Sequence, residues 1–204
     1  MLTARRFGLF FGAAALLALT GCDLYIPLFY EDPTTLSEDR SDEAKQRDDR
    51  IRGDILSAFV EQEVGTLKNV TVDVYEENVL LTGTVTDPEA RNTAGAVADS
   101  AEGAGDIFNE IQVMKDSSLR DKAEDLSIGN RLKASLRESG KINSFNLRWS
   151  VVNRVVYIFG RAKSQRERDK ALEIVRSVKG VRDVVDHIAV RSPDGAQSWL
   201  NNLL

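Results

Sequence analysis

The chain is poor in the residue types that most often carry chemistry. Among its 204 residues it has one cysteine, Cys22, and one histidine, His187. A single cysteine excludes an intrachain disulfide. A lone imidazole without a nearby nucleophile or metal-ligand cluster is most simply a surface residue. The sequence also has no phosphate-binding loop, zinc-ligand spacing or nucleophile elbow. These absences argue against an enzyme and predict neither a cofactor nor a metal.

The N-terminus has no apolar run long enough to span a membrane. The run Phe7–Leu19 has 13 residues, whereas a span needs roughly 20. It follows Arg5 and Arg6 and precedes Leu19-Thr20-Gly21-Cys22, a spacing typical of a bacterial lipoprotein signal. Residues 1–21 are therefore predicted to be a signal peptide, with Cys22 the lipidated residue. The alternative is an ordinary cleaved signal with an incidental cysteine.

Residues 22–43 are predicted to be a lipidated N-terminus followed by an acidic linker. The part nearest Cys22 is apolar and aromatic, and it suits either the bilayer interface or packing on the folded part. Residues 31–43 are acidic, contain Ser, Thr and Pro, and lack apolar periodicity, which is typical of a solvated linker.

Beyond the linker, the sequence repeats itself at a constant offset. The stretch Val79–Val85 recurs as Val156–Ala162, which places Gly83 on Gly160. The same offset aligns further apolar and turn positions, including Ile51 with Ile128, Phe59 with Leu136, Val97 with Ile174 and Gly103 with Gly180. One register that fits helix, strand and turn positions together indicates a duplicated module.

The first module, residues 44–115, is predicted to have the order αββαβ. A helix runs from Asp42 to about Val64, and the alternation of Val70, Val72 and Val74 predicts a strand. After a turn at residues 76–78, a second strand contains Gly83. Asp87-Pro88 is typical of a helix start, Gly103 is expected to end that helix, and residues 107–113 form the last strand.

The second module, residues 126–191, repeats this order. Its first strand is predicted from Phe145 to Val151, and Ser164 with Glu167 forms a capping box for the second helix. Gly180 is expected to end that helix. A charged connector, residues 116–125, joins the modules, and the alternative for Leu119 to Asp125 is an extension of the helix. Residues 192–204 form an apolar tail. The fold class is α+β: two tandem domains, each a small three-stranded mixed sheet with two helices on one face.

The two modules differ strongly in charge. Residues 44–115 contain 7 Lys and Arg against 14 Asp and Glu, whereas residues 126–191 contain 15 against 6. The net charges are therefore −7 and +9. Charge that only keeps a small domain soluble would not be expected to separate in this way, so the second module is predicted to carry a functional anion-binding surface.

The pattern of the two modules resembles the BON domain. It reads Val79-x-Leu81-x-Gly83-x-Val85 in the first and Val156-x-Ile158-x-Gly160 in the second, each followed by a helix, a glycine and a final strand. Two such modules behind a lipidation motif resemble the tandem-BON lipoproteins of Gram-negative bacteria. The resemblance implies binding of anionic phospholipid and support of envelope integrity, without catalysis. Ser127 departs from it, because membrane-contacting relatives tend to carry an aromatic residue there.

The resemblance also suggests which basic residues meet the lipid. It points to the first helix of the second module, whose core stripe is Ile128, Leu132 and Leu136. The basic side chains outside this stripe are Arg131, Lys133, Arg137 and Lys141. Ile142, at the end of the helix, is expected to dip into the bilayer interface. The second helix is the competing face, with Arg166, Arg168, Lys170 and Arg176. Because an extracytoplasmic lipoprotein rarely meets nucleic acid, no nucleic-acid partner is expected.

The protein is expected on the periplasmic side of the cell envelope, in the outer membrane rather than the inner. Asp23 argues the other way, since in enterobacterial sorting it resembles an inner-membrane retention signal. The competing function is that of a structural adaptor whose basic module binds another envelope protein or an anionic wall polymer.

Two further sets of residues are given structural roles. Gly83 and Gly160 occupy the same strand position, where a missing side chain indicates close approach by a helix or by the other strand. Tyr157 and Phe159 project from the second module's sheet away from its helices. Adjacent outward aromatics need cover, so they are predicted to pack against the first module.

Overall fold

The structure is a computed structural model that describes residues 37–61, 65–115 and 119–191. The predicted signal peptide, Cys22, most of the linker and the tail at 192–204 lie outside the described residues.

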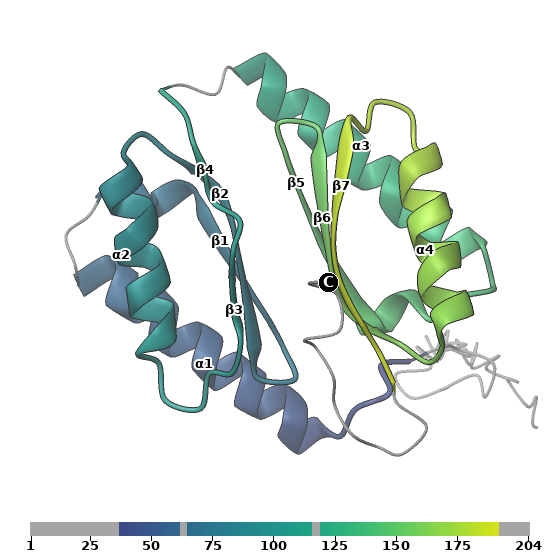
Figure 1. The fold of residues 1–204 in the computed structure, drawn as a ribbon, viewed down its shortest axis with the longest axis horizontal. Coiled ribbons are helices and arrows are strands. Elements are labelled where there is room, and N and C mark those ends of the chain that lie inside the picture. The colour runs from purple at the N-terminus through teal and green to yellow at the C-terminus, as the bar shows by residue number, and fades with distance from the viewer. Residues whose placement is uncertain (1–36, 62–64, 116–118, 192–204) are drawn as a thin grey trace, which may run out of the picture. The chain divides into compact units, whose positions relative to one another are not determined.

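The first module has the predicted order αββαβ (Figure 1). The predicted last strand, residues 107–113, is divided into two short strands by Glu110 and Ile111. The pairing register with the central strand is unchanged across this interruption. The elements are α1 (Asp42–Glu61), a 3-10 helix η1 (Gly65–Asn69), β1 (Val70–Tyr75), β2 (Asn78–Val85), α2 (Pro88–Asp99), β3 (Ile107–Asn109) and β4 (Gln112–Val113).

The second module repeats the order, with one difference from the sequence prediction: Phe145 lies in a 3-10 turn before the strand rather than in it. The charged stretch from Leu119 to Asp125 is an extension of the first helix, which is one of the two alternatives that the sequence left open. The elements are α3 (Leu119–Glu138), a 3-10 helix η2 (Ser144–Asn146), β5 (Leu147–Val152), β6 (Val155–Ala162), α4 (Gln165–Ser177) and β7 (Asp183–Val190).

Each module has a mixed sheet whose central strand has eight residues. β2 pairs antiparallel with β1 and parallel with β3 and β4, and β6 pairs in the same way with β5 and β7. In Figure 1, α1 and α2 lie along one face of the first sheet, and α3 and α4 along one face of the second. Two separate apolar cores fill these helix–sheet spaces.

The glycines in β2 and β6 are required by backbone geometry. Gly83 has φ +111° and Gly160 has φ +127°, both in the region that favours glycine. A Cβ on Gly83 would collide with the carbonyl oxygen of Asn69, and one on Gly160 with that of Asn146. Each central strand therefore passes directly against the residue that precedes the first strand of its sheet.

Gly103 and Gly180 lie slightly further along the chain than expected. α2 ends at Asp99 and α4 at Ser177, so each glycine lies in the turn beyond the helix rather than at its immediate end. Both have positive φ, +84° and +101°. Their role is to bend the connection back toward the sheet.

An aspartate on the first helix of each module fixes the hairpin turn; Asp48 is buried and its counterpart Asp125 is half-buried. Asp48 accepts hydrogen bonds from the backbone N–H groups of Glu76 and Glu77 at 2.9 and 2.8 Å. Asp125, its equivalent in the repeat, accepts bonds from Asn153 and Arg154, both at 2.7 Å. All four turn residues have positive φ, which turns adjacent N–H groups toward one acceptor. The sequence prediction missed this repeated contact.

Candidate anion-binding surface

The core stripe of α3 determines which of its basic side chains reach solvent. Ile128, Leu132 and Leu136 are fully buried against the sheet. Lys133 and Arg137 lie on the other side of the helix and are exposed, and Lys141 is exposed in the turn that follows. No ion pair within the described ranges engages these three cations, so their charge faces solvent.

Arg131 has a different role from its neighbours. Its Nε donates to the carbonyl oxygen of Lys179 at 3.1 Å, and Nη1 donates to Ser127 Oγ at 2.8 Å. Arg131 is exposed, yet its guanidinium is used to hold the turn after α4 against α3. Arg131 therefore contributes positive charge to the surface, but two of its nitrogen donors are already engaged within the protein.

The prediction that Ile142 dips into a bilayer is wrong. Ile142 is 3% exposed and packs in the helix–sheet core, because the chain turns inward directly after α3. The second module instead exposes Leu126, at 68%, and Phe145, at 42%. Sequence analysis missed both: Phe145 was assigned to a strand, and Leu126 is adjacent to, rather than part of, the core stripe.

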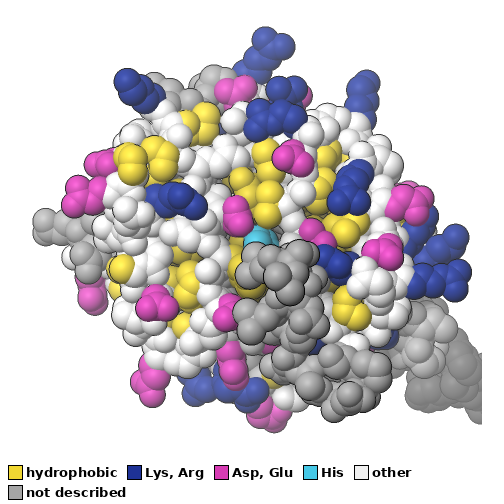
Figure 2. All heavy atoms as spheres, in the orientation of Figure 1, with side chains coloured by type: hydrophobic (Ala, Val, Ile, Leu, Met, Phe, Trp, Pro, Cys, Tyr) yellow, Lys and Arg dark blue, Asp and Glu magenta, His cyan; other side chains and the backbone are white. Residues whose placement is uncertain are grey.

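The basic residues of α4 divide into engaged and open groups. Arg168 forms an ion pair with Asp186 at 2.6 Å, and Lys170 pairs with Glu173 at 2.8 Å. Arg166 and Arg176 are exposed. Figure 2 shows Lys and Arg side chains projecting where Figure 1 places α4.

A surface hollow of about 660 Å³ brings the two competing basic sets together. Lys141, from the turn after α3, lines it with Arg166 and Lys170 from α4. Acidic side chains also line it: Glu167, Asp169 and Glu173. Lys141 therefore shares one hollow of mixed charge with α4, while no residue of α3 itself lines this hollow.

Part of the charge difference between the modules is used within the molecule. The nearly buried guanidinium of Arg161 pairs with Glu76, with Nε at 2.8 and 2.6 Å from the two carboxylate oxygens. His187 Nε2 lies 2.9 Å from Glu110 Oε1, and its ring is 4.4 Å from the ring of Phe108. His187 is therefore an interface residue and not the ordinary surface residue expected from sequence.

Tyr157 and Phe159 lie in a third apolar cluster that contains residues of both modules. Tyr75 and Leu80 of the first module belong to it, and Phe159 is fully buried. The hydroxyl oxygen of Tyr157 accepts a hydrogen bond from Gln112 Nε2 at 2.9 Å. Burial raises the pKa of Tyr157. This cluster covers the sheet faces that the helices leave open.

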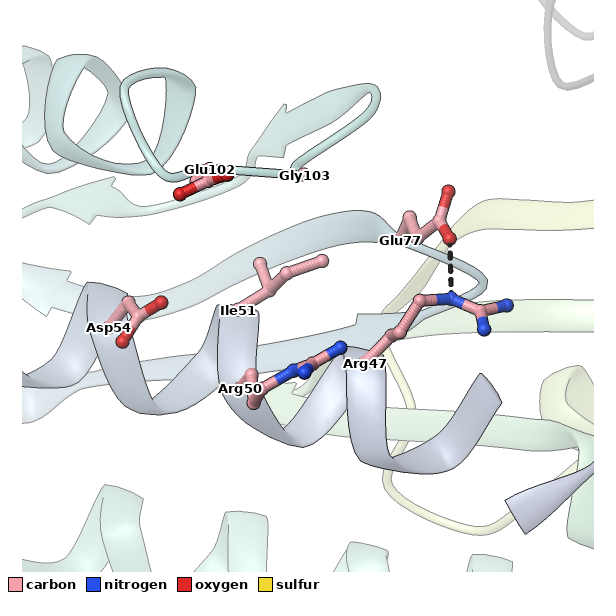
Figure 3. A pocket seen from close by; sticks show the side chains of 7 residues that line it. All are labelled: Arg47, Arg50, Ile51, Asp54, Glu77, Glu102 and Gly103. Atoms are coloured by element: carbon pink, nitrogen blue, oxygen red, sulfur yellow. Dashed lines mark hydrogen bonds and ion pairs between the residues drawn. The ribbon is translucent and has the colours of Figure 1, made fainter. Parts of the chain in front are cut away.

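The first module has a pocket whose charges differ from those at the equivalent place in the second. Its volume is about 420 Å³. Figure 3 shows Arg47 and Arg50 on α1, with Arg47 Nε 2.9 Å from Glu77, and Glu102 across the opening. Asp54, Glu77 and Glu102 correspond, at the offset that places Gly83 on Gly160, to three basic residues: Arg131, Arg154 and Lys179. Arg47 and Arg50 correspond to Glu124 and Ser127, so the equivalent positions of the second module are more basic by three charges.

Neither a metal-binding cluster nor a membrane-spanning helix occurs in the described ranges. Residues 37–61, 65–115 and 119–191 contain no cluster of three or more His, Cys, Asp or Glu side chains arranged to hold a metal ion. None of the helices in those ranges is long and apolar enough to cross a membrane.

Comparison with known proteins agrees with the repeated fold. The family model for the BON domain matches residues 47–115 and again 124–192, which is more than half of the chain. The chain belongs to the BON-domain family. The two matches begin at positions that the internal repeat aligns with each other, since residues 47 and 124 are as far apart as Gly83 and Gly160.

Three curated relatives illustrate the range of the family. The chain is 37% identical over 128 residues to an uncharacterized protein in the gshII 5' region of Anaplasma centrale, covering 62% of this chain and 85% of that protein. It is 25% identical over 111 residues to the outer membrane lipoprotein DolP of Haemophilus influenzae, covering 54% and 57%. It is 24% identical over 146 residues to the osmotically-inducible protein Y of Escherichia coli, covering 71% and 73%.

Proposed function

We propose that this protein is a non-enzymatic, lipid-anchored envelope protein that binds anionic phospholipid through its second module and supports envelope integrity. The observation that carries this proposal is the exposed basic surface of Lys133, Arg137 and Lys141 on a module of net charge +9. The similarity to proteins named as an outer membrane lipoprotein and an osmotically inducible protein supports an envelope role.

The mechanism follows from the anchor and the charge together. Acyl chains on Cys22 would keep the module close to a bilayer, at about 0.8 kcal/mol per buried methylene. Each Lys or Arg near an anionic surface then contributes about 1 kcal/mol. This attraction weakens with salt, because the screening length is about 8 Å at physiological ionic strength. The module is thereby oriented without a spanning helix.

Vesicle flotation of the chain that begins at Asp23 tests the proposal. Lys133→Glu with Arg137→Glu should abolish binding to anionic vesicles and leave the fold intact, since neither side chain is in the core. The matched control reverses Arg166 and Arg176 on α4. If only the α4 pair matters, the wrong helix has been chosen. If neither pair nor salt has an effect, binding is not electrostatic.

Lipidation has a separate test. Cys22→Ala should leave the precursor uncleaved and the protein unanchored, because the thiol is the acylated group. Metabolic labelling with a radioactive fatty acid followed by membrane fractionation measures this. Normal labelling of the variant would exclude Cys22 as the site, and fractionation of the unmodified protein would decide between the outer and inner membranes.

A second candidate function is that of a structural adaptor for another envelope protein or an anionic wall polymer. The observation that favours a protein partner is on α1, where Leu56 is 42% exposed and Val60 is 80% exposed. Exposed apolar residues four positions apart on one helix suit a helix-sized contact. A photocrosslinking residue at position 60 should capture one specific partner in whole cells if this function is correct, and none if it is not.

A further inference from the structure

Phe145 is held in a fixed position with its side chain in solvent. It lies in the turn η2 between the buried residues Ser144 and Asn146. Its backbone N–H donates to Asn143 Oδ1 at 3.3 Å, and its carbonyl oxygen accepts from Arg148 Nη1 at 2.9 Å. Hydrogen bonds on both sides fix the backbone, yet the side chain is 42% exposed. A fixed and exposed aromatic ring is suited to contact with another surface.

One cation lies over this ring, and two further lysines belong to the segments that lead to the turn and to α4. The Arg137 guanidinium lies 5.7 Å from the ring centroid, and Lys141 is exposed in the turn that leads to Phe145. Lys163, at the start of the connection to α4, keeps half of its side chain exposed. Aromatic rings favour the boundary between headgroups and acyl chains, and cations favour anionic headgroups. An exposed aromatic ring with basic side chains nearby is therefore suited to contact with an anionic bilayer.

The segment Ser37–Arg40, here termed the strap, binds the residues on both sides of Phe145. Asn143 Nδ2 donates to the Ser37 carbonyl oxygen at 2.8 Å. The backbone N–H of Asp39 donates to Asn146 Oδ1 at 2.8 Å, and Asn146 Nδ2 donates to Asp39 Oδ2 at 3.0 Å. Glu38 pairs with Arg148 at 2.8 Å, and Asp39 with Lys163 at 3.1 Å. Burial opposes the ionised carboxylate of Asp39, yet the hydrogen bonds from Asn146 and Lys163 lower its pKa.

The strap relates this turn to the predicted lipid anchor. Ser37 is the described residue nearest in sequence to Cys22, and its carbonyl oxygen accepts a hydrogen bond from Asn143, two residues before Phe145. Leu126, the other large apolar residue exposed in the described part of this module, lies nearer the middle of α3. Twelve residues separate it from the end of the helix at Glu138, which is about 18 Å at 1.5 Å per residue.

We propose that Phe145 enters the interfacial layer of an anionic bilayer while Arg137 and Lys141 contact the headgroups, and that the strap keeps this turn at the anchored end of the protein. This inference rests on the proposed phospholipid binding and names the residue that enters the lipid. It differs from the sequence-based expectation, which placed Ile142 in that role.

Site-specific labelling tests the proposal. Since Cys22 is the only cysteine, the chain that begins at Asp23 has none, and single cysteines can be introduced. Phe145→Cys, Leu126→Cys and Val60→Cys, each carrying an environment-sensitive fluorophore, are mixed with anionic phosphatidylglycerol vesicles. The label at 145 should brighten severalfold, shift to the blue and be quenched by brominated acyl chains. The labels at 126 and 60 should not respond. Flotation in parallel measures binding.

The outcomes separate this inference from the function on which it rests. A response at 126 and none at 145 overturns the assignment of Phe145. Flotation without any change in the labels also overturns it, while leaving electrostatic lipid binding in place. If no variant floats and the unlabelled chain does not float either, the proposed function itself fails. An equal response to neutral phosphatidylcholine vesicles overturns the role given to Arg137 and Lys141.

A second measurement examines the strap in the anchored protein. In the full chain, lipidated at Cys22 and labelled at position 145, Glu38→Ala with Asp39→Ala removes both acidic contacts of the strap. Quenching of the label by brominated lipid should fall severalfold. The control, Asp99→Ala, changes an exposed acidic residue on α2 and should leave quenching unchanged. Equal quenching in the strap variant would overturn the orienting role. Circular dichroism and thermal melts of each labelled chain verify that it is folded.

Discussion

The two modules place equivalent elements at one constant offset along the chain, yet their surfaces carry opposite charge. The hairpin turns, the strand glycines and the turn-binding aspartates Asp48 and Asp125 are the same in both. The solvent-facing helical positions are not: Asp54, Glu89 and Asp99 in the first module correspond to Arg131, Arg166 and Arg176 in the second. Backbone geometry was therefore retained through the duplication, while exposed side chains were free to change.

The opposite charges of the two modules form ion pairs within the molecule and also leave some cations exposed to solvent. Glu76 with Arg161 and Glu110 with His187 pair an acid of the first module with a base of the second. Glu38 and Asp39 of the strap pair with Arg148 and Lys163. Lys133, Arg137 and Lys141, like Arg166 and Arg176 on α4, form no ion pair within the described ranges and are left for an external anion. Net charge alone would have counted both groups together.

The largest expected effect concerns the glycines shared by both modules. Gly160→Val should lower the free energy of unfolding by about 4 kcal/mol, since the collision with the Asn146 carbonyl oxygen adds to the cost of a positive φ. Gly83→Val should cost a similar amount in the first module. Urea denaturation of the chain from Asp23 measures both.

The control for the glycines is Gly53→Ala on α1, where a Cβ would meet no atom within 4 Å. It should raise stability by about 0.5–1 kcal/mol, because alanine favours the helix. If Gly160→Val were harmless and Gly83→Val severe, the two strand crossings would not be equivalent.

A smaller effect is expected for the ion pair between Arg161 and Glu76, whose cation has no counterpart in the first module. Arg161 has Thr84 as its equivalent, so the first module has no matching cation. Arg161→Met should cost about 3 kcal/mol, because it leaves the carboxylate of Glu76 uncompensated in a largely buried site. Adding Glu76→Gln should restore much of that loss. A coupling free energy near zero in this double-mutant cycle would show that the pair does not hold the modules together.

The repeated turn contact allows a direct test of equivalence. Asp125→Ala should cost about 2 kcal/mol, since two backbone N–H groups lose their acceptor. Asp48→Ala should cost more, because Asp48 also pairs with Arg40. Thermal unfolding monitored by circular dichroism measures the difference. Asp99→Ala, on the surface of α2, is the control and should be nearly neutral. Equal losses at 48 and 125 would mean that the Arg40 contact adds nothing.

The smallest effect is a pH dependence at a position where the modules differ. Burial raises the pKa of Asp73, whose equivalent is Ser150. A carboxyl with a raised folded pKa lowers stability once it ionises, so this cost is present above the folded pKa and disappears as pH falls to the unfolded value. Asp73→Ser should therefore raise stability at neutral pH, and the gain should shrink in acid. Denaturation midpoints across pH measure it, and Asp99→Ser should show no such trend.

Much of the fold was predictable because its signals are local and occur twice. Alternating Val70, Val72 and Val74 predicted β1, and Asp87 does cap α2 by accepting from the N–H of Glu89. The failures occurred where local pattern and tertiary packing disagree. Phe145 continues the alternation of β5 yet lies in a turn, because the chain between α3 and β5 must bend toward the sheet. Ile142 has polar neighbours along the sequence but is buried by that same bend.

The sequence by itself determined the duplication, the order of elements, the need for glycine at 83 and 160, and the separation of charge between the modules. These depend on periodicity, backbone freedom and composition, which are readable along one chain. Only the tertiary structure decided which charges remain exposed. Arg161 and Arg137 are the same residue type in the same basic module, but one is nearly buried against Glu76 and the other faces solvent beside Phe145. The difference arises from partners distant in sequence, and no local pattern specifies those.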